Sequence, residues 1–188
     1  DLAAIMDRKD RLIKEFADYR IQQLHGFTLY EDDACFLSPH ELRVGDRTLT
    51  AASFIIATGS VTSRVEIPGL DEAGYLTSDE LLDLRDQPRS LMVLGGGAVA
   101  TEMAQFFCRI GTEVTLIQRS SHLLSSEDED LALPVEARFR DEGMHLYTGT
   151  NLQRISSQNG IKTAHFTHGQ DQREEKAASA EVILQALG

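Results

Sequence analysis

The stretch LMVLGGGAVATEMAQFFCRIGTEVTLI, from Leu91 to Ile117, decides the fold of this protein. It opens on the apolar run LMVL and closes on the apolar run VTLI, each typical of a strand buried on both faces. Between them a glycine-rich turn leads into a segment that we expect to be helical from about Ala98 to Ile110, with Gly111 as its C-terminal cap. This order predicts two parallel strands joined by a helical crossover.

The turn between the first strand and the helix has the pattern G-x-G-x-x-A, formed by Gly95, Gly97 and Ala100. The first glycine permits a tight turn, the second lets a pyrophosphate approach the backbone, and the small third residue lets the helix pack on the strand. The helix N-terminus offers free N–H groups and a positive dipole end to phosphates. In this context the pattern predicts a Rossmann-type dinucleotide site, the alternative being a turn that serves packing alone.

The residue that contacts the ribose is expected at the end of the next strand, roughly 20 positions after the turn. Gln118 stands there, followed by Arg119 and Ser120. NAD sites usually carry Asp or Glu at this point, whereas an adjacent Arg suits a 2′-phosphate. The sequence therefore favours NADP over NAD, with the alternative that Arg119 faces solvent. Glu102 lies one turn into the helix, where it would contact the dinucleotide, cap the start of the helix or face solvent.

Strand and helix signals continue on the C-terminal side of this stretch. A second helix is expected at about 130–142, with Pro134 in or near its first turn, because a proline further inside would kink it. Upstream, the sequence TSDE at 77–80 predicts a capping box that opens a short helix. Further strands are expected at 144–147, 151–155, 163–166 and 182–184, with a polar turn at 169–176.

The part of the chain before Pro68 has a different pattern. Residues 2–24 carry apolar side chains at mostly helical spacing. The apolar run FIIA at 54–57 predicts another strand buried on both faces. Short strand-like runs are also expected at 27–30, 34–37 and 41–44.

Composition excludes several classes of function. The formal net charge is −12 and the pI is about 4.8, so a nucleic-acid backbone would be repelled. No apolar run approaches the roughly 20 residues that span a bilayer, so no membrane partner is expected. Cys35 and Cys108 are too far apart for a C-x-x-C or zinc motif, and the histidines lack a ligand set, so no metal site is expected. Reduced thiols and the lack of a signal-peptide pattern favour the cytoplasm.

Five stretches occur in a recognisable order along the chain. They are SFIIATGS (53–60), IPGL (67–70), YLTSDELL (75–82), VLGGGAVATEMAQFFCRIGTEVTLIQRS (93–120) and EVILQALG (181–188). This ordered set resembles the FAD-dependent pyridine nucleotide-disulfide oxidoreductases, which include dihydrolipoamide dehydrogenase, glutathione reductase and mercuric reductase. Val99-Ala100, and TLIQRS without an acid, lean towards the mercuric reductase-like branch.

The resemblance implies an α/β fold with two parts. Residues 67–188 would form a Rossmann-like NAD(P)H-binding domain with a β-meander. Residues 1–66 would form a partial FAD-binding domain, a helix plus a β-meander ending in the ATG strand. Hydride would pass from the nicotinamide to FAD and on to a disulfide or related acceptor.

The same resemblance implies which residues bind cofactor. Glu102 matches a glutamate near the nicotinamide and flavin, and Gly188 the glycine that ends the last strand of the NAD(P)H domain. Some relatives carry, at Ala98, a Tyr that stacks over the flavin. The stretch that closes the FAD domain against the flavin nucleotide is matched by Ala57, Thr58 and Gly59, and the NAD(P)H turn by Gly95, Gly97, Ala98, Val99 and Ala100, with Gln118, Arg119 and Ser120 at the ribose.

Three parts of the family pattern have no counterpart in this chain: the first glycine turn, which holds FAD, the redox cysteine pair and the C-terminal dimerisation domain. The chain is therefore expected to be the central fragment of a larger enzyme, inactive alone, with FAD bound only in a full-length parent that forms a homodimer. No catalytic residue is assigned.

Two other interpretations stay open. One is a stand-alone dinucleotide-binding or regulatory module without catalysis. The other is a different Rossmann enzyme, although no Tyr here is followed four places on by Lys, as short-chain dehydrogenases require, and a methyltransferase usually has an acid where Gln118 stands.

Overall fold

The computed structural model describes residues 1–169 and 174–187, which fall into two compact units. The smaller unit is Lys9–Val61, and the larger one joins Asp1–Arg8 to the chain from Thr62 onward. Helix α1 (Leu2–Gln23) begins in the larger unit and ends in the smaller. The functional division at residues 66 and 67 stays a prediction.

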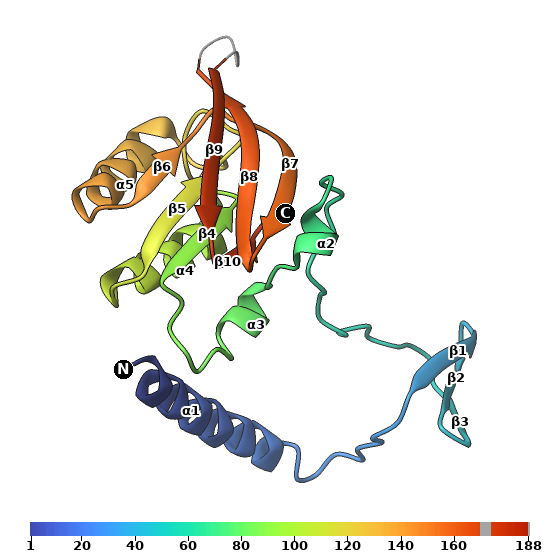
Figure 1. The fold of residues 1–188 in the computed structure, drawn as a ribbon. Coiled ribbons are helices and arrows are strands. Elements are labelled where there is room, and N and C mark those ends of the chain that lie inside the picture. The colour runs from blue at the N-terminus through green and yellow to red at the C-terminus, as the bar shows by residue number, and fades with distance from the viewer. Residues whose placement is uncertain (170–173, 188) are drawn as a thin grey trace. The chain divides into compact units, whose positions relative to one another are not determined.

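The larger unit is built on a four-stranded parallel sheet with the strand order β10-β4-β5-β6 (Figure 1). The alternation of strands and helices expected after Pro68 is confirmed, and so is the α/β fold class. The turn at 95–97 joins the first strand of the alternation to its helix. The elements are β4 (Ser90–Leu94), α4 (Ala98–Arg109), β5 (Glu113–Ile117), α5 (Glu129–Asp141), β6 (His145–Tyr147) and β10 (Val182–Gln185).

An antiparallel meander lies between β6 and β10 in the chain. It consists of β7 (Asn151–Gln158), β8 (Ile161–His168) and β9 (Glu174–Ala180). Of the polar turn expected at 169–176, residues 170–173 lie outside the described residues. Two short helices, α2 (Leu70–Ala73) and α3 (Ser78–Leu81), precede the sheet, and the second begins at the expected capping box. There the backbone N–H of Thr77 donates to Glu80 Oε2 over 2.8 Å.

Alternate residues of β4 explain its continuous apolar run. Leu91 and Val93 pack with the apolar side chains of α4 and α5, whereas Met92 and Leu94 pack with the meander. The sheet is therefore buried on both faces, between a layer of helices and a layer of antiparallel strands. Only Leu94 among these four is as much as 1% exposed.

The smaller unit contains the other meander, the three antiparallel strands β1 (Ala34–Ser38), β2 (Glu41–Val44) and β3 (Arg47–Thr50). The strand expected at 54–57 is wrong, because this segment is irregular and Ile55 is 94% exposed. A strand needs a neighbour that takes up its backbone N–H and C=O groups, and no described residue pairs with this segment. Residues 27–30 are irregular for the same reason.

The proline in α5 also departs from expectation. The helix begins at Glu129, so Pro134 is its sixth residue and lies in the second turn. Its missing N–H leaves the Asp130 carbonyl without an intrahelical partner. That residue is exposed to solvent, which can satisfy the carbonyl.

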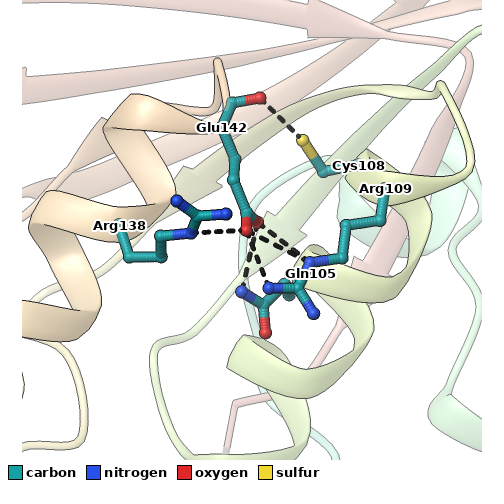
Figure 2. Close-up of polar contacts among 5 residues, drawn as sticks. All are labelled: Gln105, Cys108, Arg109, Arg138 and Glu142. Carbon is teal, nitrogen blue, oxygen red and sulfur yellow. Dashed lines mark hydrogen bonds and ion pairs between the residues drawn. The ribbon is translucent and has the colours of Figure 1, made fainter.

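The C-terminal ends of α4 and α5 are joined through Glu142 (Figure 2). Its carboxylate accepts from Arg109 Nη2 at 2.7 Å, Arg138 Nε at 2.8 Å and Gln105 Nε2 at 3.1 Å, and its side chain is only 10% exposed. Its backbone carbonyl accepts from Cys108 Sγ at 3.3 Å. The hydrogen bond from Arg109, with those from Gln105 and Arg138, lowers the pKa of Glu142 from 4.5 to about 2. The cluster thus fixes the C-terminal end of α4, and the glycine turn leads into the N-terminal end of the same helix.

This depressed pKa predicts an acid-dependent loss of stability. Because the folded-state pKa lies below the ordinary value, the stabilisation by Glu142 is complete above about pH 4.5 and is lost as the pH falls towards 2. At pH 7 we expect Glu142→Gln to melt at a lower temperature than the unaltered protein, and the difference to shrink below pH 4.5. Thermal melts from pH 7 to pH 3 measure this. Glu72→Gln, an exposed residue with no ion pair among the described residues, controls for the lost charge. A difference that is independent of pH would contradict the prediction.

Candidate dinucleotide site

A cavity of about 590 Å³ opens at the carboxyl ends of β4 and β5. This is the edge at which parallel α/β sheets bind ligands. The glycine turn and the first turn of α4 form one side, and the residues after β5 form another. Further walls come from the segment before α2, the start of β7 and the end of β10. The lining residues include Gly95 to Ala100, Gln118 to Ser120, Ser125, Thr150 to Leu152, Val65, Ile67, Ala186 and Leu187.

The glycines of the turn are required for different reasons. Gly95 has a φ of +117°, and a Cβ there would collide with the carbonyl of Ala186. A Cβ on Gly96 would lie 2.8 Å from Gln118 Cδ. A Cβ on Gly97 would meet no atom within 4 Å, and this residue is exposed at a φ of −76°. The first two glycines are thus required by the protein's own packing, whereas the third leaves space at the cavity that the protein does not use.

Helix α4 presents its N-terminus to this space. Gly97 is the N-cap and provides no side chain to cap the helix. The N–H groups of the first turn have no acceptor within the helix, which leaves Ala98, Val99 and Ala100 as available donors. The dipole of the twelve-residue helix adds partial positive charge at the same place. Ala100 is 1% exposed, as its predicted role in close helix–strand packing requires.

The corner after β5, where the sequence predicts the ribose, is buried at Gln118 and exposed at Arg119. Gln118 is 8% exposed, and its backbone N–H donates to the carbonyl of Tyr147 over 2.8 Å. Its side-chain Oε1 accepts from the backbone N–H of Arg119 at 3.1 Å. The Arg119 side chain is exposed and forms no ion pair with any described residue. The corner therefore offers a guanidinium group that no carboxylate of the described residues neutralises.

The loop after Arg119 is fixed against the glycine turn. The N–H of Leu124 donates to the carbonyl of Gly96 over 2.7 Å, and the N–H of Gly149 donates to the carbonyl of Ser120 over 2.7 Å. These bonds bring the hydroxyl-bearing Ser125 to the cavity.

Sequence reasoning missed three polar lining residues, Ser125, Thr150 and Asn151. Thr150 donates from its hydroxyl to the carbonyl of Gln118 at 2.9 Å, which ties the start of the meander to the residue that follows β5. Their positions after predicted strands could have indicated them, because residues that follow parallel strands gather at one edge of the sheet.

Several predicted site residues are not brought to this cavity. Glu102 is exposed on α4 and does not line it. Ala57, Thr58 and Gly59 belong to the smaller unit and are exposed. Gly188 lies outside the described residues. Their predicted roles remain predictions. Within residues 1–169 and 174–187, no cluster of His, Cys, Asp and Glu is placed to hold a metal, and no helix is both long and apolar enough to cross a membrane.

Comparison with known proteins gives concordant matches. The family described as pyridine nucleotide-disulphide oxidoreductase matches residues 4–188. A mercuric reductase of Staphylococcus aureus is 35% identical over 191 aligned positions, which cover 100% of this chain and 34% of the relative. A dihydrolipoyl dehydrogenase of Bacillus subtilis is 27% identical over 100% of this chain and 41% of the relative. The chain thus spans about a third of the length of the mercuric reductase.

A solved structure agrees with the sequence matches. The HOCl-induced flavoprotein disulfide reductase RclA from Escherichia coli superposes with a TM-score of 0.87 at 26% identity, covering 100% of this chain and 43% of that one.

Proposed function

The chain belongs to the pyridine nucleotide-disulphide oxidoreductase family, and on that premise we propose that residues 67–188 are the NAD(P)H-binding portion of a flavoprotein oxidoreductase. The family supports a flavin-dependent redox function in general terms. The proposal assigns the nicotinamide dinucleotide to the cavity at the glycine turn. In the parent enzyme, hydride passes from the nicotinamide to FAD and on to a disulfide or related acceptor.

The open position at Gly97 is the observation that carries the proposal. A glycine kept only for packing has neighbours that a side chain would displace, as Gly95 does. Gly97 has none, yet it stands between a helix N-terminus and a cavity of about 590 Å³. A pyrophosphate placed there would receive the N–H groups of α4 and the positive end of its dipole. Cavities of several hundred Å³ hold small-molecule ligands of this size.

The chain's own residues would bind and orient the cofactor. The first turn of α4 would fix the pyrophosphate, and the corner at Gln118, Arg119 and Ser120 would hold the ribose. The bound nicotinamide supplies the hydride. The arrangement fits NAD(P)H. Ala57 to Gly59 would contribute only part of a flavin site in the parent enzyme.

Direct binding tests the proposal. The chain contains no Trp, so the fluorescence of the reduced nicotinamide, or calorimetry, is the suitable signal. We expect NADPH to bind at one site per chain and NADH more weakly. Failure of both reduced dinucleotides to bind would refute the proposal.

The stand-alone regulatory module remains the second candidate, because it too would bind a dinucleotide in the cavity at the glycine turn. It would bind the dinucleotide but show no nicotinamide oxidation when the full-length gene product is supplied with FAD and an electron acceptor. The parent enzyme is proposed to be a homodimer. A cytoplasmic location is proposed as well, because both cysteines are free.

Residues 1–188 are expected to bind no FAD in stoichiometric amount. Residues 54–59 are irregular, and Ile56 in this segment is 72% exposed, so they do not form a closed site. An absorbance spectrum of the purified protein checks this. A band of one flavin per chain at about 450 nm, where flavins absorb, would show that the 54–59 segment suffices for a flavin site.

A further inference from the structure

Gln185, the last residue of β10, is a polar side chain in an apolar layer. It is 2% exposed and lies two positions after Ile183, so both side chains belong to the sheet face that the meander covers. A buried amide costs free energy unless its donors and acceptor are satisfied. The position therefore requires an explanation other than core packing.

The side-chain nitrogen of Gln185 forms hydrogen bonds, whereas its side-chain oxygen forms none with the described residues. Its Nε2 donates to the carbonyl of Ser63 at 3.1 Å and to the carbonyl of Leu187 at 3.4 Å. Both neighbours are carbonyl oxygens, so the nitrogen must occupy this place, because a flipped amide would set oxygen against oxygen. Its Oε1 is buried and meets no donor among the described residues. An unpaired buried acceptor opposes folding, so stability alone does not account for this glutamine.

The partner residue, Ser63, begins the segment that forms one wall of the dinucleotide cavity. Val65 and Ile67, two and four positions on, line that cavity. The far end of the segment is fixed to the meander, where the carbonyl of Pro68 accepts from the N–H of Ile155 at 2.8 Å. Gln185 thus holds the start of this segment at Ser63, and the backbone of β7 holds its end at Pro68.

We propose that Gln185 is a positioning residue for dinucleotide binding, which holds residues 63–67 so that Val65 and Ile67 stand against the bound cofactor. The inference rests on the proposed function of the cavity. The amide does not touch the cofactor, because Gln185 does not line the cavity. It acts by limiting the positions that the wall adopts before the ligand arrives, which lowers the ordering cost of binding.

The variant Gln185→Met separates positioning from stability. Methionine keeps the unbranched shape but removes the two hydrogen bonds and the unpaired oxygen. We expect the NADPH dissociation constant to rise about three- to tenfold, because binding would then have to order the wall, at a cost comparable to that of immobilising one side chain. We expect the melting temperature to stay the same or rise, and amide hydrogen exchange within 62–67 to become faster. Gln185→Leu is the second variant, with the same expectations.

Gln87→Met is the matched control. Gln87 Nε2 also donates to a backbone carbonyl, that of Ile110 at 2.9 Å, but Ile110 does not belong to a segment that lines the cavity. This variant should leave NADPH affinity and exchange within 62–67 unchanged.

The outcomes separate the inference from the function on which it rests. Unchanged NADPH affinity in both Gln185 variants overturns the inference, and so does a loss of affinity that accompanies a lower melting temperature. An unaltered protein that binds no reduced dinucleotide overturns the proposed function. In that case the exchange measurement alone decides whether Gln185 holds the segment.

Discussion

Gly97→Thr is expected to weaken NADPH binding by at least about 100-fold without impairing folding. The backbone at Gly97 has a φ of −76°, which any residue adopts, and an added Cβ meets no atom within 4 Å. Thr is also about as good an N-cap as Gly, so the change in stability should stay within about 0.5 kcal/mol.

The loss of affinity has two physical causes. The new side chain would occupy the space in which the pyrophosphate approaches the backbone. Its hydroxyl would also accept from the N–H of Val99 or Ala100, and so compete for the donors that the phosphate needs. Loss of two charge-assisted hydrogen bonds, each worth about 1.5–3 kcal/mol, corresponds to at least about 100-fold in affinity.

Isothermal calorimetry with NADPH and a thermal melt of each variant measure the two effects. Gly26→Thr is the control, because Gly26 is also exposed and also has no atom near an added Cβ. Gly95→Ala provides the contrast: its φ of +117° and the collision with Ala186 should destabilise the fold itself. Tight NADPH binding by Gly97→Thr would place the dinucleotide elsewhere.

Arg119→Ala is expected to weaken NADPH binding about 10- to 100-fold and to leave NADH binding nearly unchanged. The two cofactors differ only in the 2′-phosphate, so a selective loss reports contact with that group. A charge-assisted hydrogen bond contributes about 1.5–3 kcal/mol, which is the basis of the expected range. The guanidinium is exposed beside the cavity and has no ion pair with a described residue, so no competing bond must be broken.

The neighbouring residues support this preference without repelling a phosphate. Gln118 is neutral, so it does not repel a 2′-phosphate, and its Oε1 accepts from the Arg119 backbone at 3.1 Å. Ser120 and Ser125 line the same cavity and can donate to phosphate oxygens.

Binding of both reduced dinucleotides to each protein at two salt concentrations decides the matter, because screening should weaken NADPH binding more. Arg43→Ala, at an exposed arginine of the smaller unit, controls for the change in net charge. Equal binding of NADH and NADPH by the unaltered protein, or NADPH affinity untouched in Arg119→Ala, would reject the preference.

The sheet of the larger unit could be predicted because its signals are local. Apolar runs such as LMVL mark strands buried on both faces, Gly111 ends a helix, and Thr77 with Glu80 forms a capping box within four residues. The run at 54–57 gave the same local signal and failed. A strand also needs a partner distant in sequence, and the described residues supply none.

The sequence by itself determined the glycine turn, the helix that follows it and the strand that ends just before Gln118, because each depends on neighbours within a few positions. Only the tertiary structure separated the packing role of Gly95 from the open position at Gly97, since the atoms around them come from distant segments. It also brought Ser125, Asn151 and the wall at Val65 to one cavity. The buried amide of Gln185 reaches the carbonyl of Ser63, 122 positions away. Such contacts follow from how the chain crosses the sheet edge, where strands that are far apart in sequence end side by side, and a local pattern does not record them.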